Sequence, residues 1–299
     1  MRDITEYAQQ KAETEITTEL QTNGAFNSKI REWILDNINI VWVSFDGTPD
    51  IQNAQRPFPN KKPSAPIIED NVKWLIANRG NRNLMIGARV TMTDLNVNSQ
   101  IEMVDYFDGL GIKQVWTDPI FSEVKKKPVC EDLEREEKYH INMNIYVKKF
   151  IEAHRYAKTK GVFYGSFLTC NFDGESKTNC RACTPVPHLT TDGYVSACDM
   201  ALDGEHAKHM DCFIYGKWNT KTKKFSYFEN KIKALQDRNT DKLTHCKSCI
   251  AKLHCGGYCL GEVVNTTGEL NGQLPIICNA VRALYKELGS CDKYDYMHP

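Results

Sequence analysis

The sequence predicts an α/β protein, with a parallel sheet in residues 1–165 and a smaller, irregular domain in residues 166–299. Three observations lead to this prediction. Apolar, β-branched segments alternate with amphipathic segments, an order typical of parallel sheets with right-handed crossovers. Every expected strand ends in a polar or small cluster. In the last part of the chain the segments become short, and seven of the twelve cysteines form a spaced series from Cys183 to Cys278.

The first elements alternate between helix and strand. Residues 1–12 have the pattern of the end of an amphipathic helix, and residues 16–24 predict a β-branched strand that closes in an Asn-Gly turn. Residues 27–37 predict a helix with an asparagine or serine N-cap and one apolar face. Residues 38–47 are almost continuously apolar, which is the pattern of a strand buried on both faces.

The middle of the first domain continues the same order. Residues 48–66 are rich in Pro and Asn and are expected to form a long loop. A helix is expected at 67–79, a buried strand at 84–92, a helix at 99–111 and a strand at 113–121.

A helix at about 136–158 and a strand at 161–167 complete the series. The strands end in the clusters QTNG, SFDG, RVTM and TDP. Ligands of parallel sheets and barrels bind at the carboxyl ends of the strands, so we expect a binding site among these clusters.

Composition and charge exclude several functions. The formal net charge is zero, so we expect no nucleic-acid partner and no anionic membrane partner. No apolar run approaches the roughly 18–20 residues of a membrane helix. The first residues are polar and of mixed charge, without the apolar core of a signal peptide. We therefore expect a soluble cytoplasmic protein.

The cysteine series predicts metal ligation rather than disulfides. Disulfide scaffolds belong to short secreted chains, whereas this chain is long and has no secretion signal. The spacing within the last part is C-x2-C-x5-C-x3-C, and two adjacent glycines permit close approach of the backbone. Seven thiolates exceed one four-ligand site by three, so two sites are expected. Spacing alone leaves zinc and iron–sulfur clusters as open alternatives.

The whole pattern, including Gly193 and the segment CKSCIAKLHCGGYC, resembles the SPASM domain of radical S-adenosylmethionine (SAM) peptide and protein maturases. The strand–helix units before it look like the partial (β/α)6 barrel of the same family. The resemblance implies two auxiliary 4Fe–4S clusters. By resemblance, the ligands of the first would be Cys183, Cys198 and Cys259, and those of the second Cys246, Cys249, Cys255 and Cys278.

One further cysteine completes the first cluster in the sulfatase-maturing relatives. Cys180 is the best candidate for this position, although its spacing to Cys183 is shorter than in those relatives, and Cys170 is the second candidate. Cys130, Cys212 and Cys291 are expected to be ordinary thiols.

The sequence departs from the family in one respect. The CxxxCxxC motif whose cluster cleaves SAM does not occur among the 299 residues, nor does a GGEP-like motif. By the resemblance both would precede residue 1. The expectation is therefore a truncated maturase that is inactive alone, and the alternative is a degenerate protein that only binds metal or peptide.

The resemblance also suggests residues of the SAM and substrate sites. Ser44 would contact SAM, and Arg56 would approach its carboxylate or ribose, since the guanidinium pairs with carboxylates at two points. Gln21 points toward the same region. Asp199 corresponds to the aspartate that takes a proton from substrate in sulfatase-maturing relatives. The alternatives are a solvated loop arginine for Arg56 and a turn role for the Gln21 region.

Neighbouring polar residues are weaker candidates. Asp46 could serve only to form the turn before Gly47, and Arg89 and Thr91 lie at the end of the next strand.

The leading hypothesis is an enzyme that oxidises or cross-links a side chain of a peptide or protein. The implied partners are that substrate, SAM, and an electron donor such as flavodoxin or ferredoxin. The resemblance implies a radical formed from SAM, which abstracts hydrogen from the substrate. The alternatives are an iron–sulfur module for electron transfer or peptide binding, and a zinc-stabilised scaffold.

Overall fold

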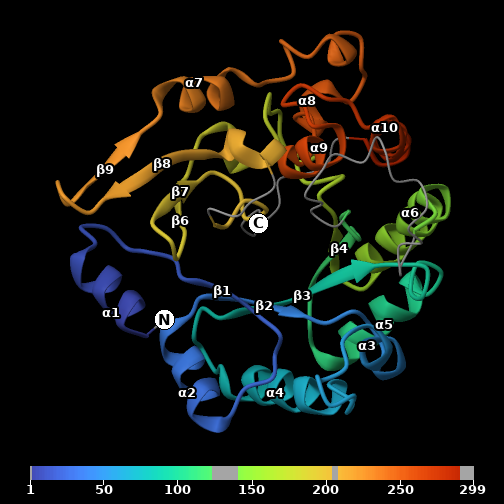
Figure 1. The fold of residues 1–299 in the computed structure, drawn as a ribbon. Coiled ribbons are helices and arrows are strands. Elements are labelled where there is room, and N and C mark those ends of the chain that lie inside the picture. Colours follow the sequence, from blue (N-terminus) through green and yellow to red (C-terminus); the bar gives the residue numbers. More distant parts are fainter. Residues whose placement is uncertain (1, 123–140, 204–207, 290–299) are drawn as a thin grey trace. The chain divides into compact units, whose positions relative to one another are not determined.

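The computed structural model describes residues 2–122, 141–203 and 208–289. The chain divides into two compact units (Figure 1). Of the described residues, the first unit contains 2–120 and 141–166. The second unit contains 121–122, 167–203 and 208–289.

A five-stranded parallel sheet forms the centre of the first unit, with its strands in chain order. This confirms the predicted α/β class. The strands are β1 (Glu19–Thr22), β2 (Ile40–Ser44), β3 (Met85–Met92), β4 (Gln114–Pro119) and β5 (Phe163–Gly165).

The helices of the first unit fall close to the amphipathic segments of the sequence. Asn27 caps the second helix, and its side chain accepts a hydrogen bond from the N–H of Ile30. Part of the helix expected at 136–158 lies outside the described residues. The helices are α1 (Arg2–Lys11), α2 (Ser28–Asn37), α3 (Pro49–Gln55), α4 (Ala65–Asn78), α5 (Gln100–Leu110) and α6 (Met143–Thr159).

The segment 48–66 corrects one expectation, because it contains α3 and the start of α4 rather than one long loop. Pro49 occupies the first turn of α3, where a missing N–H costs nothing and the fixed φ suits a helix. The abundance of proline and asparagine was therefore a misleading signal for irregular structure.

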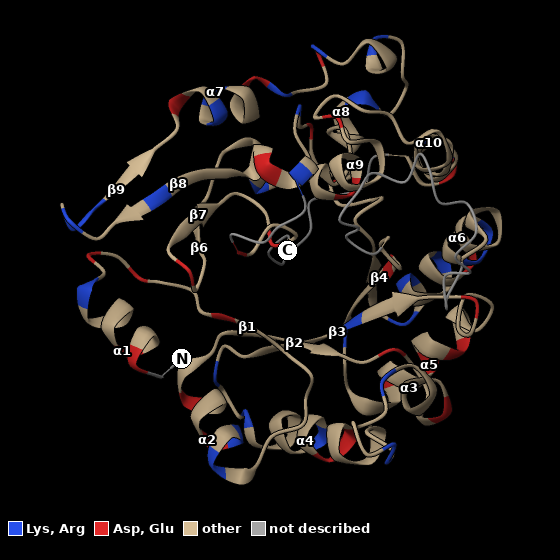
Figure 2. Ribbon diagram, in the orientation of Figure 1, with Lys and Arg blue, Asp and Glu red and all other residues tan. Residues whose placement is uncertain are grey.

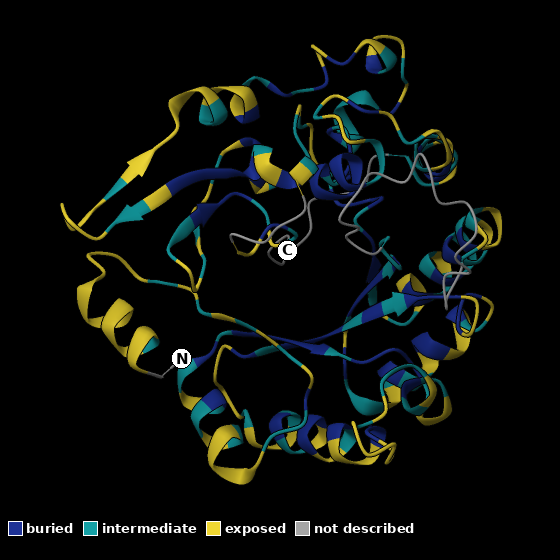
Figure 3. Cartoon of the chain, viewed as in Figure 1, coloured by how far each residue is buried: buried dark blue, intermediate teal, exposed yellow. Residues whose placement is uncertain are grey.

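The core of the first unit lies between the sheet and its helices. Val41, Val43 and Phe45 are fully buried along β2, and α4 and α5 show buried and exposed residues in alternation (Figure 3). Helices α4 and α6 carry both basic and acidic side chains (Figure 2). Within the described ranges, no helix combines the length and apolarity needed to cross a membrane.

The second unit is more regular than the sequence predicts. It contains a four-stranded antiparallel sheet, which the prediction of an irregular domain missed. Its strands are β6 (His188–Leu189), β7 (Tyr194–Ser196), β8 (Ile214–Asn219) and β9 (Lys224–Tyr227). Its helices are α7 (Glu229–Asp237), α8 (Lys252–Cys255), α9 (Leu260–Thr267) and α10 (Pro275–Leu288), with three short 3-10 turns at Arg181–Cys183, Lys208–Phe213 and Thr244–Cys246.

The second unit has its own apolar core. Val195 of β7, Leu235 of α7 and Leu260 of α9 are buried together in it, and Met210 and Phe213 join them from a 3-10 turn. Three cysteines that the sequence marks as ligands, Cys180, Cys183 and Cys198, pack on or within this core. The core thus supports the segments that carry the thiols.

Candidate functional site: two groups of cysteines and one face of the parallel sheet

Four predicted ligands of the first site come together in the second unit. The thiol of Cys183 donates a hydrogen bond to the sulfur of Cys180, and Cys198 and Cys259 both interact electrostatically with Cys180. We call these four residues the first cysteine group. The structure thereby places Cys180, the preferred fourth candidate, with the three cysteines assigned by the resemblance.

The other four predicted ligands line one pocket. Its lining includes the four thiol-bearing residues together with Tyr258, Leu274 and Arg282. We call the four the second cysteine group: Cys246, Cys249, Cys255 and Cys278. Cys246 ends a 3-10 turn, Cys249 lies in the segment before α8, Cys255 ends α8, and Cys278 lies in α10.

Burial dominates the electrostatics of the thiols. In the first group it raises the pKa of Cys198 to about 11 and that of Cys259 to about 12. In the second group it raises the pKa of Cys246 and of Cys255 to about 11. The hydrogen bond within the Cys180–Cys183 pair lowers the pKa of Cys180 and raises that of Cys183. A metal centre would stabilise the thiolates, because thiolates are the form that binds metal.

The segment between Cys255 and Cys259 has an unusual backbone. Gly256, Gly257 and Tyr258 all have positive φ, at 59°, 86° and 62°. Non-glycine residues rarely adopt this conformation, so Tyr258 is held there by its surroundings. Three left-handed residues in succession reverse the chain, so that Cys255 belongs to the second group and Cys259 to the first.

Small residues let the two groups pack closely. A Cβ at Gly256 would lie 2.4 Å from the carbonyl carbon of Thr178, just before Cys180. A Cβ at Gly261 would lie 2.8 Å from the sulfur of Cys198. Gly256 is therefore needed both for the turn and for the approach of the segment before Cys180, and Gly261 of α9 is needed for the approach of Cys198.

The remaining cysteines take other positions. The sulfur of Cys170 lies 3.4 Å from the side-chain nitrogen of Asn179, and Cys212 is half-buried near Cys198. Cys130 and Cys291 lie outside the described residues. Among the residues that the structure describes, no three or more His, Cys, Asp or Glu side chains are arranged to hold a single metal ion.

Asp199 has a side-chain partner that the sequence did not predict. Its carboxylate lies 2.7 Å from Nδ1 of His188 on β6, and the Asp199 side chain is 76% exposed. Within the second unit, the Asp199 carboxylate is therefore open to solvent. His188 orients the carboxylate beside Cys198.

In the first unit, the predicted SAM-contacting residues fall on one face of the sheet. Strand pairing aligns Gln21 with Trp42, and Ser44 with Arg89. Side chains at aligned positions of parallel strands share a face, and alternate residues along a strand do too. Gln21, Trp42, Ser44 and Arg89 therefore occupy the same face, which we call the aromatic face.

Arg89 lies at the centre of the aromatic face. Its guanidinium carbon is 5.0 Å from the ring centre of Trp42 and 5.5 Å from that of Trp116, within the range of cation–π attraction. Asp118 lies 3.5 Å away from its Nη1. Burial lowers the pKa of Arg89, and Asp118 opposes this shift.

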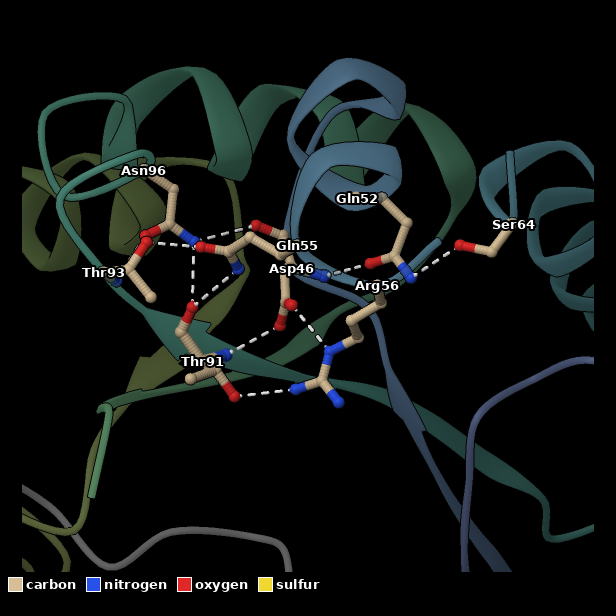
Figure 4. Close-up of polar contacts among 8 residues, drawn as sticks. All are labelled: Asp46, Gln52, Gln55, Arg56, Ser64, Thr91, Thr93 and Asn96. Carbon is tan, nitrogen blue, oxygen red and sulfur yellow. Dashed lines mark hydrogen bonds and ion pairs between the residues drawn. The ribbon is translucent and has the colours of Figure 1, made fainter. Parts of the chain in front are cut away.

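The side chains of Asp46 and Thr91 bind the guanidinium of Arg56 (Figure 4). Its Nε donates to Oδ2 of Asp46 at 2.6 Å, and its Nη2 donates to the hydroxyl of Thr91 at 2.7 Å. The other oxygen of Asp46 accepts the N–H of Thr91 at 2.8 Å, and the side chain of Asn96 donates to the carbonyl of Asp46. Arg56 is thus more than a solvated loop arginine, and Asp46 does more than form a turn.

Several residues of these sites have no sequence signal. Gln52 accepts the N–H of Asp46 at 2.8 Å, and Asn96 bridges the ends of β2 and β3. Arg238 is buried beside the first cysteine group. The roles of these polar residues depend on their contacts in the folded chain, and no spacing of residues in the sequence predicts those contacts.

Comparisons with solved structures agree with this architecture. The chain is similar to anSMEcpe, determined with bound SAM, with a TM-score of 0.72, 15% identity, and coverage of 96% of this chain and 74% of that chain. It is equally similar to anSMEcpe with bound SAM and a peptide, Cp18Cys, at 15% identity, covering 96% of this chain and 78% of the other.

A more distant similarity is to SuiB of Streptococcus suis bound to SAM, with a TM-score of 0.54, 12% identity, and coverage of 88% of this chain and 60% of that chain. No protein-family model and no curated sequence matches the chain. At these identities the similarity shows a shared fold.

Proposed function

We propose that this chain is the barrel and auxiliary-cluster part of a radical SAM enzyme that oxidises or cross-links a peptide or protein side chain. The main observation behind the proposal is that one chain combines a parallel sheet of this fold with two groups of four cysteines. The SAM and the peptide in the similar structures support it.

The cysteine groups fit iron–sulfur clusters by their chemistry. Eight soft thiol ligands in two sets of four match the ligand count of two 4Fe–4S clusters. The first group would hold one cluster and the second group the other. When bound, such clusters supply one-electron transfer, and an electron donor such as flavodoxin or ferredoxin in the cytoplasm would exchange electrons with them.

The first unit would bind SAM on its aromatic face. Ser44 and Gln21 offer hydrogen bonds there, and Arg56 adds positive charge at the end of β2. The hydrogen bonds of Arg56 to Asp46 and Thr91 support a role in fixing the end of α3 against the ends of β2 and β3. Asp199, oriented by His188, would take a proton from substrate.

Iron and sulfide analysis tests the proposal. After anaerobic reconstitution, we expect about eight irons and eight sulfides per chain. Cys255→Ser and Cys259→Ser should each lose about half of the iron, because the two residues belong to different groups. Cys212→Ser, a half-buried cysteine outside both groups, is the matched control and should keep all of it. A colourless protein with two zincs would overturn the iron–sulfur assignment.

We also propose that these 299 residues do not cleave SAM by themselves, because they contain no CxxxCxxC motif. Incubation with SAM and dithionite should give no 5′-deoxyadenosine above a protein-free control. Formation of this product at catalytic rates would contradict the proposal.

A second candidate function is a module for electron transfer or peptide binding. Both cysteine groups lie in one unit that has its own apolar core, which favours this reading. The two functions differ in SAM binding. A reconstituted protein that binds a cysteine-containing peptide but not SAM would support the second candidate.

A further inference from the structure

Arg238 is a buried cation with no carboxylate partner among the residues that the structure describes. It follows the last turn of α7, and only 2% of it is exposed. A buried arginine is expected to have an anionic partner, because moving its charge out of water costs several kcal/mol. In the described part of the chain, no carboxylate lies within ion-pair distance of Arg238.

The contacts of Arg238 are with backbone carbonyls and thiols. Its Nη2 donates to the carbonyl of Gly257 at 2.7 Å, and its Nη1 lies 3.5 Å from the carbonyl of Gly256. Its side chain also hydrogen-bonds to Cys183. Its Nε is buried without a partner. Two dipoles and a thiol do not balance a full charge in a buried site.

The position of Arg238 relates it to both cysteine groups. It acts electrostatically on Cys180 and Cys183 of the first group and on Cys246 of the second. A Cβ at Gly257 would lie 2.7 Å from its Nη1, so glycine at this position makes room for the guanidinium. The segment that separates the groups is therefore packed directly against this cation.

We propose that Arg238 is the shared counter-ion of the two metal centres, and that it raises their reduction potentials. This inference rests on the proposed function, since it requires thiolate-ligated clusters in the two groups. Such a cluster is an anion, and one-electron reduction adds one further negative charge to it. A nearby buried cation stabilises the more negative state, and net charge and hydrogen bonds to sulfur are known determinants of cluster potential.

The test is a redox titration of the reconstituted full-length chain, followed by electron paramagnetic resonance. Arg238→Gln removes the charge but keeps hydrogen-bonding capacity, and we expect both midpoint potentials to move to more negative values. The first group should shift more, because Arg238 contacts Cys183 directly. Arg238→Lys keeps the charge and should retain most of the wild-type potential.

Arg181 provides the matched control, because it lies between Cys180 and Cys183 in sequence but its side chain is exposed. Water screens an exposed charge, so Arg181→Gln should leave both potentials close to wild type. An equal shift in Arg181→Gln and Arg238→Gln would overturn the inference, since it would show that burial is irrelevant.

The outcomes separate this inference from the proposed function. A wild-type chain that takes up no iron refutes the proposed function. Wild-type loading with unchanged potentials in Arg238→Gln refutes only the role of Arg238. If Arg238→Gln does not load, Arg238→Lys must load with near wild-type potentials. If Arg238→Lys also takes up no iron, Arg238 acts through its packing rather than its charge, and the inference is overturned.

Discussion

Gly87 shows how strongly one residue of the aromatic face is constrained. It lies in β3 opposite Trp42, and a Cβ at this position would lie 2.2 Å from the indole ring. Gly87→Ala must therefore displace a buried indole. We expect it to lower the free energy of unfolding by about 1–3 kcal/mol, measured by urea denaturation.

Gly109 is the matched control for this substitution. It lies in α5 with open space around it, so alanine there meets no neighbour and favours the helix. Gly109→Ala should raise the free energy of unfolding by about 0.5–1 kcal/mol. Equal effects of the two substitutions would show that the indole does not lie against Gly87.

His154 gives the first unit a dependence on pH. Its Nδ1 lies 2.8 Å from the carbonyl of Tyr164, its ring stacks on Phe150, and burial lowers its pKa. The unfolded chain therefore binds a proton at a higher pH than the folded chain does. The stability that neutral His154 contributes is full above about pH 6.5 and is lost as pH falls through its lowered pKa.

Comparison with His154→Gln isolates this contribution. Wild type should lose more free energy of unfolding between pH 7.5 and pH 5 than His154→Gln loses, in anaerobic urea titrations. Parallel losses in the two proteins would exclude His154 as the titrating group.

Single residues differ in how far the sequence predicts them. The cysteines stood out because part of their spacing is local, whereas their division into two sets of four followed from the family resemblance and stays a prediction. Arg238 and the His188–Asp199 pair were not predicted, because their partners are distant in sequence. Asn96 was missed because its amide acquires its role only where the ends of β2 and β3 meet, and Gln52 because its amide links Asp46 to Ser64.

At the scale of elements, the Asp46–Arg56 pair fastens the end of α3 to the ends of β2 and β3. Asp46 is 1% exposed, so its carboxylate depends on Arg56 and on the N–H of Thr91. Arg56→Met leaves this buried charge with one partner fewer. We expect a loss of about 1–3 kcal/mol in the free energy of unfolding.

A double-mutant cycle with Asp46→Asn measures the pair itself. The sum of the losses in free energy of unfolding for the two single variants should exceed the loss for the double variant, by a coupling energy of about 1 kcal/mol or more. If the two single losses simply add up in the double variant, the Asp46–Arg56 pair does not hold the end of α3 to the sheet. The exposed pair of Arg82 and Asp36 is the matched control and should show little coupling.

Elements were predictable where their hydrophobic period was clear. Strands β2 and β3 and helices α2, α4 and α5 lie within a few residues of the predicted ranges. Helix α3 was missed because its seven residues include only one buried side chain, Gln52, so no apolar period marks it. The second sheet was missed because β6 and β7 are two and three residues long, too short to show alternation.

For the whole molecule, loss of metal should affect the two units differently. The free energy of metal binding is also folding free energy for the segments that carry the ligands. On removal of iron with a chelator, we expect amide hydrogen exchange to accelerate by about tenfold or more around the cysteine groups. Exchange in β2 and β3 should stay unchanged, since their core is apolar and closed by helices. Uniform acceleration across both units would contradict this.

The predicted division of the chain near residue 165 rested on a change in the character of the sequence. Long alternating segments gave way to short ones rich in cysteine, and the parallel sheet of the first unit matches the predicted class. The antiparallel sheet of the second unit depends on pairing among strands that are individually too weak to predict. Its core, which includes Cys183, forms only when those strands meet.

The reversed segment from Cys255 to Cys259 has a consequence for assembly. One end belongs to each cysteine group, and the three left-handed residues between them leave little freedom to adjust one end alone. Filling the second group would fix the position of Cys259 before the first group is filled. At substoichiometric iron, chains with both groups filled should therefore be more abundant than independent filling of the two groups would give.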